Sequence, residues 1–239
     1  MITVKHSGNV GDIIYSMPSL QYLSNTTNQL IKFYLNVNAE FMSIELATAL
    51  KPLLEHQSYI DSVEMYSGEY IDYDLDMFRE FHKSGDNLGE SHAKIFNFDA
   101  SILNTQSIYI DHSYEITLPV YDIIINRTMR YNNPEFPWET VLNEQYADHT
   151  KCFVGNKTEY DTFVNSFNVD VNYVPTANFL QVGFLINKSK IFIGNCSSPY
   201  AIAETMKHMS IQESCTWCLS CLYKRPNAYY FTDNFFQIN

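Results

Sequence analysis

The chain has 239 residues, of which 46% are apolar and 18% are charged, so it can bury a core and is not a disordered chain. Its 27 acidic side chains outnumber the 15 lysines and arginines, and the resulting net charge of −12 argues against a protein that coats nucleic acid. The length allows one large domain or two domains of roughly 100–120 residues each.

No secretory or membrane-spanning segment is evident in the sequence. The first six residues run directly into a glycine-containing loop, without the apolar stretch of about 7–15 residues that a signal peptide carries. The longest apolar runs, such as residues 121–125, fall far below the ~20 residues of a membrane-spanning helix. A soluble, cytoplasmic protein is therefore expected, with its five cysteines present as thiols or metal ligands rather than as disulfides.

The first part of the chain alternates strand and helix patterns, which predicts parallel pairing of its strands. The strands are expected at residues 2–7, 31–37 and 62–66, and the helices at residues 13–23 and 41–54. Residues 8–12 are interpreted as a turn. The middle of the chain is expected to be irregular over residues 67–104, with one helix near 74–82, then a strand at 107–111 and an extended interdomain crossing at 115–120.

A second alternation begins at Tyr121 and repeats the plan of the first part. Its strands are expected at residues 122–127, 151–155, 171–174, 190–194 and 210–214, and its helices at residues 138–147, 159–167, 178–187 and 198–206. The repetition predicts an α/β protein made of two small Rossmann-like domains, residues 1–118 and 119–239. We expect them to face each other across a ligand cleft at the carboxyl ends of their strands.

A glycine loop follows the first strand and contains Gly8, Gly11 and Asp12. Glycines let the backbone turn sharply and approach a ligand closely, and the start of the next helix favours an anion. The spacing is not GxGxxG, so the sequence does not support a dinucleotide fingerprint. Asp12 has two interpretations: a residue that satisfies backbone donors at the helix start, or a carboxylate that acts as a general base.

Asn195, Ser197 and Ser198 follow a late strand, and Pro199 suits the first turn of the next helix. Unpaired N–H groups and small hydroxyl side chains at such a junction predict a phosphate site, although an ordinary capped strand–helix junction has the same pattern. The absence of a GK[ST] run excludes a P-loop.

Charged residues follow two other strands of the second half. Arg127 and Arg130 lie three residues apart, where they either clamp a diphosphate or pair with carboxylates of this acidic chain. Glu159 comes after the predicted strand at 151–155, where it either accepts the hydroxyls of a ribose or supports the first turn of a helix.

Three cysteines crowd into one segment, at Cys215, Cys218 and Cys221. Two overlapping CxxC units suit zinc or an iron–sulfur cluster if a fourth ligand joins them, and Cys196 or His208 is a candidate for that ligand. No second CxxC lies at zinc-ribbon spacing, so the primary expectation is that the protein binds no metal, with this triplet as the alternative.

Taken in order, these segments resemble a known family. The run from Gly11 to Leu20, GDIIYSMPSL, resembles the N-terminal motif of the ADP-heptose–lipopolysaccharide heptosyltransferases. The late strand, turn and helix at residues 191–203 are similar to the C-terminal signature of that family. Between them, residues 127–138 resemble the segment before its W-P element, and residues 153–155 resemble its glycine-ended strand.

This resemblance implies the GT-B glycosyltransferase fold, a nucleotide-diphosphate sugar bound mainly by the C-terminal domain, and no requirement for a metal. It also implies that Asp12 is the catalytic base. Asn195, Ser197 and Ser198 correspond to positions that hold the donor diphosphate, and Glu159 lies near the carboxylate that contacts the donor ribose.

The sequence therefore predicts an inverting, metal-independent glycosyltransferase without a cofactor. Its acceptor is left open among a glycan, a lipid-linked sugar, a protein and a modified nucleobase. One alternative is a binding or regulatory module that keeps the sugar-nucleotide site without turnover. Another is an interaction protein that a metal stabilises at the cysteine triplet.

Overall fold

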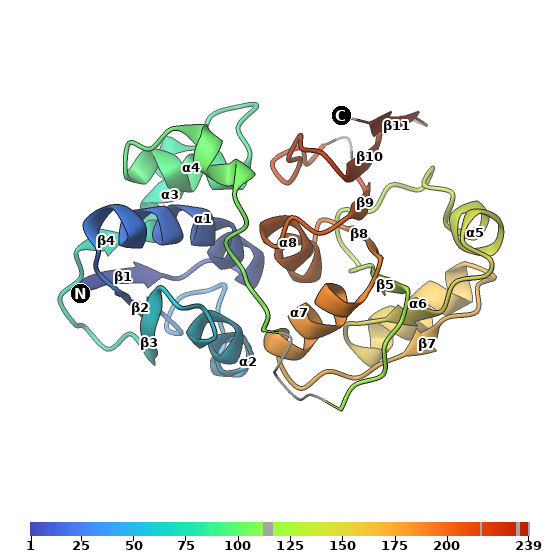
Figure 1. Cartoon of the computed structure of the whole chain (residues 1–239), viewed down its shortest axis with the longest axis horizontal. Helices are drawn as coiled ribbons and strands as arrows, with labels where there is room; N and C mark the ends of the chain where they lie inside the picture. Colours follow the sequence, from blue (N-terminus) through green and yellow to red (C-terminus); the bar gives the residue numbers. More distant parts are fainter. Residues whose placement is uncertain (112–116, 216, 233–234, 239) are drawn as a thin grey trace. The chain divides into compact units, whose positions relative to one another are not determined.

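The structure is a computed structural model that describes residues 1–111, 117–215, 217–232 and 235–238 (Figure 1). The chain divides into two compact units. Unit 1 contains residues 1–111 together with 178–180, and unit 2 contains residues 112–177 and 181–239. Each unit holds its own sheet, so the two are described separately. None of the described helices is both long enough and apolar enough to cross a membrane.

Unit 1 is built on a four-stranded sheet in which every pairing is parallel, with the order β3-β2-β1-β4. The strands are β1 (Ile2–His6), β2 (Ile31–Leu35), β3 (Ile60–Met65) and β4 (Tyr73–Asp74). The α-helices are α1 (Val10–Thr27), α2 (Ile44–Glu55), α3 (Phe78–Phe81) and α4 (Leu88–Ile95), and the 3₁₀ turns are η1 (Leu75–Met77) and η2 (Ala100–Asn104).

The start of α1 differs from the predicted turn at residues 8–12. The helix begins at Val10, because Asn9 is extended and its backbone N–H donates to the Asp12 carboxylate at 3.1 Å. This contact satisfies a donor at the helix end, so Gly11 and Asp12 belong to the first helical turn rather than to a loop. Of the turn predicted at residues 8–12, only residues 8 and 9 precede the helix.

Two other expectations for unit 1 are corrected. Residues 107–111 are not a strand, because the backbone of Tyr109 pairs with the Gln57 side chain, which accepts from its N–H at 2.8 Å. The segment expected to be irregular contains α4, which begins with a capping box formed by Asn87 and Glu90. Of the expected crossing at 115–120, residues 115–116 lie outside the described residues, and residues 117–120 form neither helix nor strand.

Unit 2 is built on a seven-stranded sheet with the order β11-β10-β9-β8-β5-β6-β7. Every pairing is parallel except that of β10 with β11. The strands are β5 (Ile123–Asn126), β6 (Lys151–Phe153), β7 (Asn172–Tyr173), β8 (Ile191–Asn195), β9 (Ser210–Glu213), β10 (Ala228–Thr232) and β11 (Phe235–Ile238). The helices are α5 (Trp138–Thr140), a π-helical segment η3 (Val141–Gln145), α6 (Lys157–Ser166), α7 (Phe179–Lys188) and α8 (Ser198–Thr205).

The central strands of this sheet are buried along their whole length. β5 and β8 are continuous apolar runs, as expected for parallel strands covered on both faces. The core between this sheet and its helices is rich in aromatic side chains, which are Phe136, Trp138, Phe153, Phe163 and Phe231. The strand predicted at residues 210–214 is present as β9, but it is not the last strand, since β10 and β11 extend the sheet beyond it.

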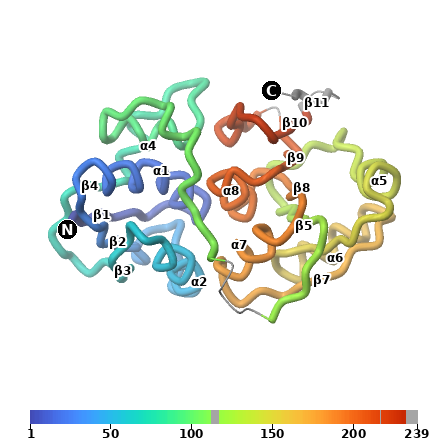
Figure 2. Tube along the Cα trace, in the orientation of Figure 1, coloured from blue at the N-terminus to red at the C-terminus, as the bar shows by residue number. Residues whose placement is uncertain are grey.

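Register brings the polar segments of unit 2 to one edge of its sheet. Asn126 pairs with Gly194, and Asn195 pairs with Glu213, so β5, β8 and β9 end at the same level. A Cβ atom on Gly194 would lie 2.5 Å from the carbonyl oxygen of Asn126, so only glycine fits this close approach. α8 follows directly and packs beside β8 and β9 (Figure 2).

Candidate functional site

The β1–α1 junction of unit 1 is shaped by a glycine that cannot be replaced without movement. The Gly8 N–H donates to His6 Nδ1 at 2.9 Å. A Cβ atom on Gly8 would lie 2.7 Å from the His6 ring and 2.9 Å from Asp12 Oδ2. A Cβ atom on Gly11 would meet nothing within 4 Å, so the first turn of α1 has open space beside it.

Asp12 has the helix-start role that its sequence position left open, and its role as a general base stays a prediction. Its Oδ2 atom accepts from the Asn9 N–H at 3.1 Å and lies 3.9 Å from an Arg79 guanidinium nitrogen. Within the described residues, all of these contacts use Oδ2, and the side chain is 17% exposed. The carboxylate is therefore oriented by the helix end and by a cation, while Oδ1 is left for another partner.

Asp76 stands behind this junction and was missed by the sequence analysis. It accepts from the Ser7 N–H at 2.9 Å and from the Ser7 hydroxyl, and it lies 3.2 Å from the Lys5 ammonium. Burial raises the pKa of Asp76, but hydrogen bonds from His6 and Ser7 outweigh burial and hold that pKa well below its usual range. This residue stays ionised and fixes the loop; no motif marks it, because the contacts join positions about 70 residues apart.

Two buried histidines, His6 and His92, are hydrogen-bonded to each other behind the glycine loop. The Nε2 atoms of His6 and His92 are 3.1 Å apart, and His92 Nδ1 lies 2.8 Å from the Leu88 carbonyl oxygen. Burial, and then the neighbouring His6, hold the pKa of His92 well below its usual value, so His92 is neutral. A neutral His92 that donates from Nδ1 to Leu88 must accept at Nε2 from His6.

The β8–α8 turn of unit 2 begins a helix with a hydroxyl cap. Ser197 is the N-cap residue of α8, and its Oγ accepts from the Tyr200 N–H at 3.3 Å. Ser198 and Pro199 form the first helical turn, in which proline has no N–H that would need a partner. Both serines are partly exposed. The N-terminal end of α8 thus has a capped helix start whose N–H groups and dipole favour an anion, and the phosphate site stays a prediction.

Asn195 is fully buried and holds a neighbouring loop through its side chain. Its Oδ1 accepts from the Thr128 N–H at 3.0 Å, while Nδ2 donates to the carbonyl oxygens of Thr128 and Arg130 at 3.1 and 2.6 Å. A further contact of 2.8 Å joins Nδ2 to Asn132. The carboxamide is therefore used to position residues 128–132, and a direct contact with a donor stays a prediction.

Arg127 pairs with a carboxylate, as one of its two interpretations held. Its Nε and Nη2 atoms lie 2.8 and 3.1 Å from the two oxygens of Glu213, which is fully buried. Glu213 also accepts from the Asn133 N–H at 2.7 Å and the Trp138 indole N–H at 3.2 Å. Burial raises the pKa of Glu213, and Arg127 opposes that rise. Arg130, in contrast, is exposed and forms no ion pair within the described residues.

Glu159 occupies the third position of α6 and closes a capping box with Asn156. Its Oε2 accepts from the Asn156 N–H at 3.1 Å, and its own N–H donates to Asn156 Oδ1 at 2.8 Å. Burial raises the pKa of Glu159. The supporting role at the helix start is thus present, and the contact with a ribose stays a prediction.

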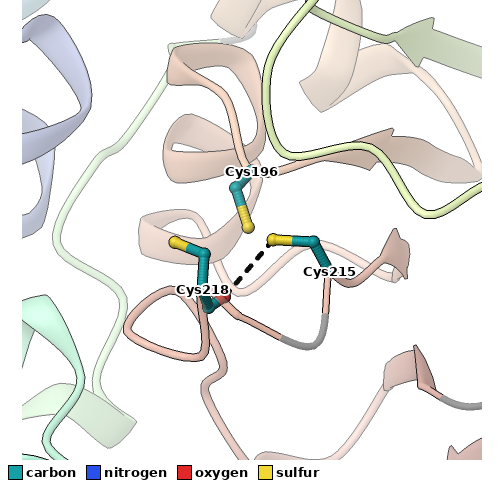
Figure 3. A group of neighbouring side chains, drawn as sticks. All are labelled: Cys196, Cys215 and Cys218. Carbon is teal, nitrogen blue, oxygen red and sulfur yellow. Dashed lines mark hydrogen bonds between the residues drawn. The ribbon is translucent and has the colours of Figure 1, made fainter.

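Cysteines from two segments converge beside the β8–α8 turn. Cys196 follows Asn195 directly, and its thiol lies near those of Cys215 and Cys218, with every pair of sulfur atoms within 4.8 Å (Figure 3). The remaining cysteine of the triplet, Cys221, is buried, and its carbonyl oxygen accepts from Gln212 Nε2, which also donates to the Cys196 thiol, both at 3.3 Å. The sequence named Cys196 as one of two candidate fourth ligands. The other candidate, His208, instead places Nε2 3.1 Å from the Ser189 hydroxyl.

Two pockets of unit 1 lie away from these residues. Their volumes are about 440 and 400 Å³, and both are lined by Gln21 and Asn25 on the C-terminal half of α1. No predicted site residue lines either pocket. Most of the predicted site residues therefore lie at the β1–α1 and β8–α8 junctions, away from both pockets.

Comparison with known proteins gives likeness in structure but not in sequence. No family model and no curated protein sequence matches the chain. A glycosyl transferase family 9 protein from Veillonella parvula superposes with a TM-score of 0.66 and 11% identity, over 96% of this chain and 86% of that one. The chain has the fold of a glycosyltransferase.

Two Escherichia coli structures extend this likeness. Heptosyltransferase WaaC, solved with ADP-2-deoxy-2-fluoro heptose, has a TM-score of 0.59 and 10% identity, over 88% of this chain and 87% of that one. The iron-containing dodecameric glycosyltransferase TibC has a TM-score of 0.61 and 11% identity. That match covers 95% of this chain but 61% of TibC, so this chain spans less than two thirds of TibC.

Proposed function

We propose that the chain is an inverting glycosyltransferase of the GT-B type, which transfers a sugar from a nucleotide-diphosphate donor to an acceptor hydroxyl without a catalytic metal. The observation that carries this proposal is the fold likeness, which extends over 96% of the chain with a TM-score of 0.66. The structures of WaaC with ADP-2-deoxy-2-fluoro heptose and with ADP support a nucleotide sugar as the donor class.

The donor diphosphate is proposed to bind at the β8–α8 turn. The N–H groups and the dipole at the start of α8 attract an anion, and the hydroxyls of Ser197 and Ser198 are available as donors. Arg130 supplies the cation of this site, because the guanidinium of Arg127 is already held by Glu213. Glu159 is the proposed ribose contact. Asn195 contributes by fixing the loop that carries Arg130.

Asp12 is the proposed general base. Its Oδ1 atom would take the proton of the acceptor hydroxyl while the oxygen bonds to the anomeric carbon. The bond from that carbon to the diphosphate breaks in the same step, and the nucleoside diphosphate leaves with the electron pair. A single displacement of this kind inverts the anomeric configuration. The open space beside Gly11 in the first turn of α1 leaves room for an acceptor.

A binding module without turnover is the second candidate. Three residues predicted at the donor site, Asn195, Arg127 and Glu159, already form hydrogen bonds to other groups of unit 2. Because an active donor site would present such side chains to the ligand, these contacts favour the binding module. Such a module would keep the fold and bind nucleotide sugars, yet would not transfer or hydrolyse them.

A thermal-shift screen against ADP-, UDP- and GDP-sugars tests the proposal, followed by an assay for nucleoside diphosphate release. A donor at ~100 times its Kd should stabilise the protein by about 2.7 kcal/mol. Arg130→Ala should weaken that donor, whereas Lys190→Ala, which removes another exposed cation of unit 2, should not. Binding without release in the presence of acceptor extracts would favour the binding module, and no stabilisation by any nucleotide sugar would refute both candidates.

A further inference from the structure

Four cysteines come together beside the β8–α8 turn. Cys196, Cys215 and Cys218 place their Sγ atoms within 4.8 Å of one another, and the buried Cys221 lies next to them, because Gln212 donates both to the Cys196 thiol and to the Cys221 carbonyl oxygen. Two disulfides would use the four sulfur atoms in pairs and would not need a common centre. Figure 3 shows three of these side chains beside one another, Cys196 from the β8–α8 turn and the other two from the segment after β9.

The spacing of the sulfur atoms matches the size of a metal site. Tetrahedral coordination with metal–sulfur bonds of about 2.3 Å places sulfur ligands about 3.8 Å apart. The Sγ atoms of Cys196, Cys215 and Cys218 lie within 4.8 Å of one another, which is compatible with that spacing, and Cys221, three residues after Cys218, provides the fourth sulfur. The cluster is also largely closed to solvent, because Cys196, Cys215 and Cys221 are 4%, 1% and 8% exposed.

We propose that Cys196, Cys215, Cys218 and Cys221 bind one metal ion as four thiolates. A set of four sulfur donors is soft, so it selects zinc or iron over magnesium or calcium. Binding is coordination without a change in oxidation state: four metal–sulfur bonds form, and the four thiol protons pass to solvent. A closed site with four protein ligands leaves no position for substrate, so the ion is structural. This proposal stands whether or not the chain transfers sugar.

The neighbours of the cluster indicate what the ion would hold together. Gln212 Nε2 donates to Cys196 Sγ and to the Cys221 carbonyl oxygen, both at 3.3 Å. Hydrogen bonds of this kind orient the ligands of a metal. Cys196 lies between Asn195, which holds residues 128–132, and Ser197, which caps α8. The ion would therefore join the β8–α8 turn to the segment that follows β9.

Metal analysis of the purified full chain tests the site. We expect about one equivalent of zinc or iron in the wild type and in Cys152→Ala, and less than about 0.1 equivalent in Cys218→Ser and Cys196→Ser. Cys152 is the matched control, since it is buried on β6 and burial alone raises the pKa of its thiol to about 12. Less than about 0.1 equivalent in the wild type after anaerobic reconstitution with either metal would overturn the proposal.

Spectroscopy identifies the ion and does not depend on the variants folding. Iron(III) bound by thiolates absorbs in the visible range, whereas a zinc protein is colourless until cobalt(II) replaces the zinc and gives the d–d bands of a tetrahedral site. An intact mass lower by the hydrogens lost in a disulfide, with thiols unreactive before reduction, would overturn the proposal in favour of disulfides.

Trp217 offers a readout of structure at the site that is independent of activity. It lies between Cys215 and Cys218, is 69% exposed, and its ring centroid is 5.1 Å from that of Tyr131. Removal of the metal by a chelator should change the emission of Trp217 and increase hydrogen exchange in residues 195–205. Trp217→Phe should abolish the emission change. Unaltered exchange in a protein proved to have lost its metal would show that the ion does not hold the turn, and would overturn the structural role.

Discussion

The two strand–turn–helix junctions, β1–α1 in unit 1 and β8–α8 in unit 2, have similar backbones and opposite chemistry. The first is surrounded by titratable side chains. Asp12 begins the helix beside Arg79, Asp76 anchors the loop, and His6 and His92 form a buried pair behind it. Charged and titratable side chains therefore surround this helix start.

The second junction is walled by neutral groups. Asn195 and Ser197 hold its backbone, and Cys196 adds a thiol. A charge pair also lies in unit 2, but there both oxygens of Glu213 already bind the guanidinium of Arg127. A net negative charge of 12 repels a diphosphate, so a site for one must rely on local N–H groups and on Arg130. The difference teaches that the same strand–turn–helix order can surround a helix start with charged groups in one unit and with neutral groups in the other.

The largest effect is expected from Asp12→Asn. The variant keeps an oxygen that accepts from the Asn9 N–H, so the helix start and the stability should persist. Loss of a general base should lower kcat by about 10²–10⁴-fold, with donor affinity unchanged. The matched control is Glu90→Gln, which alters the same capping position of α4 in unit 1 without touching the proposed chemistry. Full activity in Asp12→Asn would remove Asp12 from the mechanism.

The next effect concerns the closed charge pair of unit 2. Arg127→Met leaves Glu213 buried without its cation and should cost about 3–5 kcal/mol of unfolding free energy. Urea unfolding followed by tryptophan emission reports it, because Trp138 and Trp217 are the two tryptophans of the chain and both lie in unit 2. Asp161→Asn, which breaks an exposed pair with Lys157, should change stability little. Equal stabilities would show that the pair is not desolvated.

Alanine substitutions at three glycines compare how much space each junction leaves for a Cβ atom. Gly194→Ala should cost the most, because its Cβ would meet the Asn126 backbone at 2.5 Å, and overpacking of this kind costs about 1–3 kcal/mol or more. Gly8→Ala should cost less, since the His6 and Asp12 side chains can move. Gly11→Ala should be neutral or stabilise by up to about 1 kcal/mol. Thermal unfolding followed by circular dichroism ranks them, and the reverse order would contradict the geometry.

A smaller effect is the pH dependence of unit 2. Burial, and then Arg225, lower the pKa of His208 from 6.5 to about 4. The unfolded chain therefore binds more protons between these values, and stability is present above pH 6.5 and lost as the pH falls toward 4. The loss between pH 7 and pH 5 should be about 2 kcal/mol at 1.36 kcal/mol per pKa unit. Urea unfolding of His208→Gln at both pH values should show a shallower dependence; an identical one would contradict this assignment.

Local sequence patterns were sufficient for most of the strands and helices. β5 and β8 were predicted because each contains three consecutive large apolar residues followed by a polar or glycine-containing turn, a pattern typical of a buried parallel strand. The start of α1 was misplaced, since two glycines near the start were interpreted as a loop although Asn9 and Asp12 cap a helix. α4 was missed because its apolar face is short and its start depends on a capping box.

The partners of the candidate residues could not be predicted in the same way. Asp76, Glu213 and His92 contact groups that lie between about 70 and 90 residues away, and no spacing rule reaches that far. Glu213 in particular ends a strand that the sequence predicted without indicating which cation it would bind. The cysteine triplet was visible, and Cys196 was named, but only the fold brings them together.

The pairing of Arg225 with Glu204 has a consequence for the order in which the protein matures. Arg225 Nε lies 2.9 Å from both oxygens of this buried glutamate of α8, and its Nη2 donates to the His208 carbonyl oxygen at 2.7 Å. Arg225 is 21 residues further along the chain, so Glu204 can pair with this cation only after the ribosome has made residue 225. We therefore expect the carboxylate of α8 to be buried with its arginine partner late in synthesis, after most of unit 2 has been made.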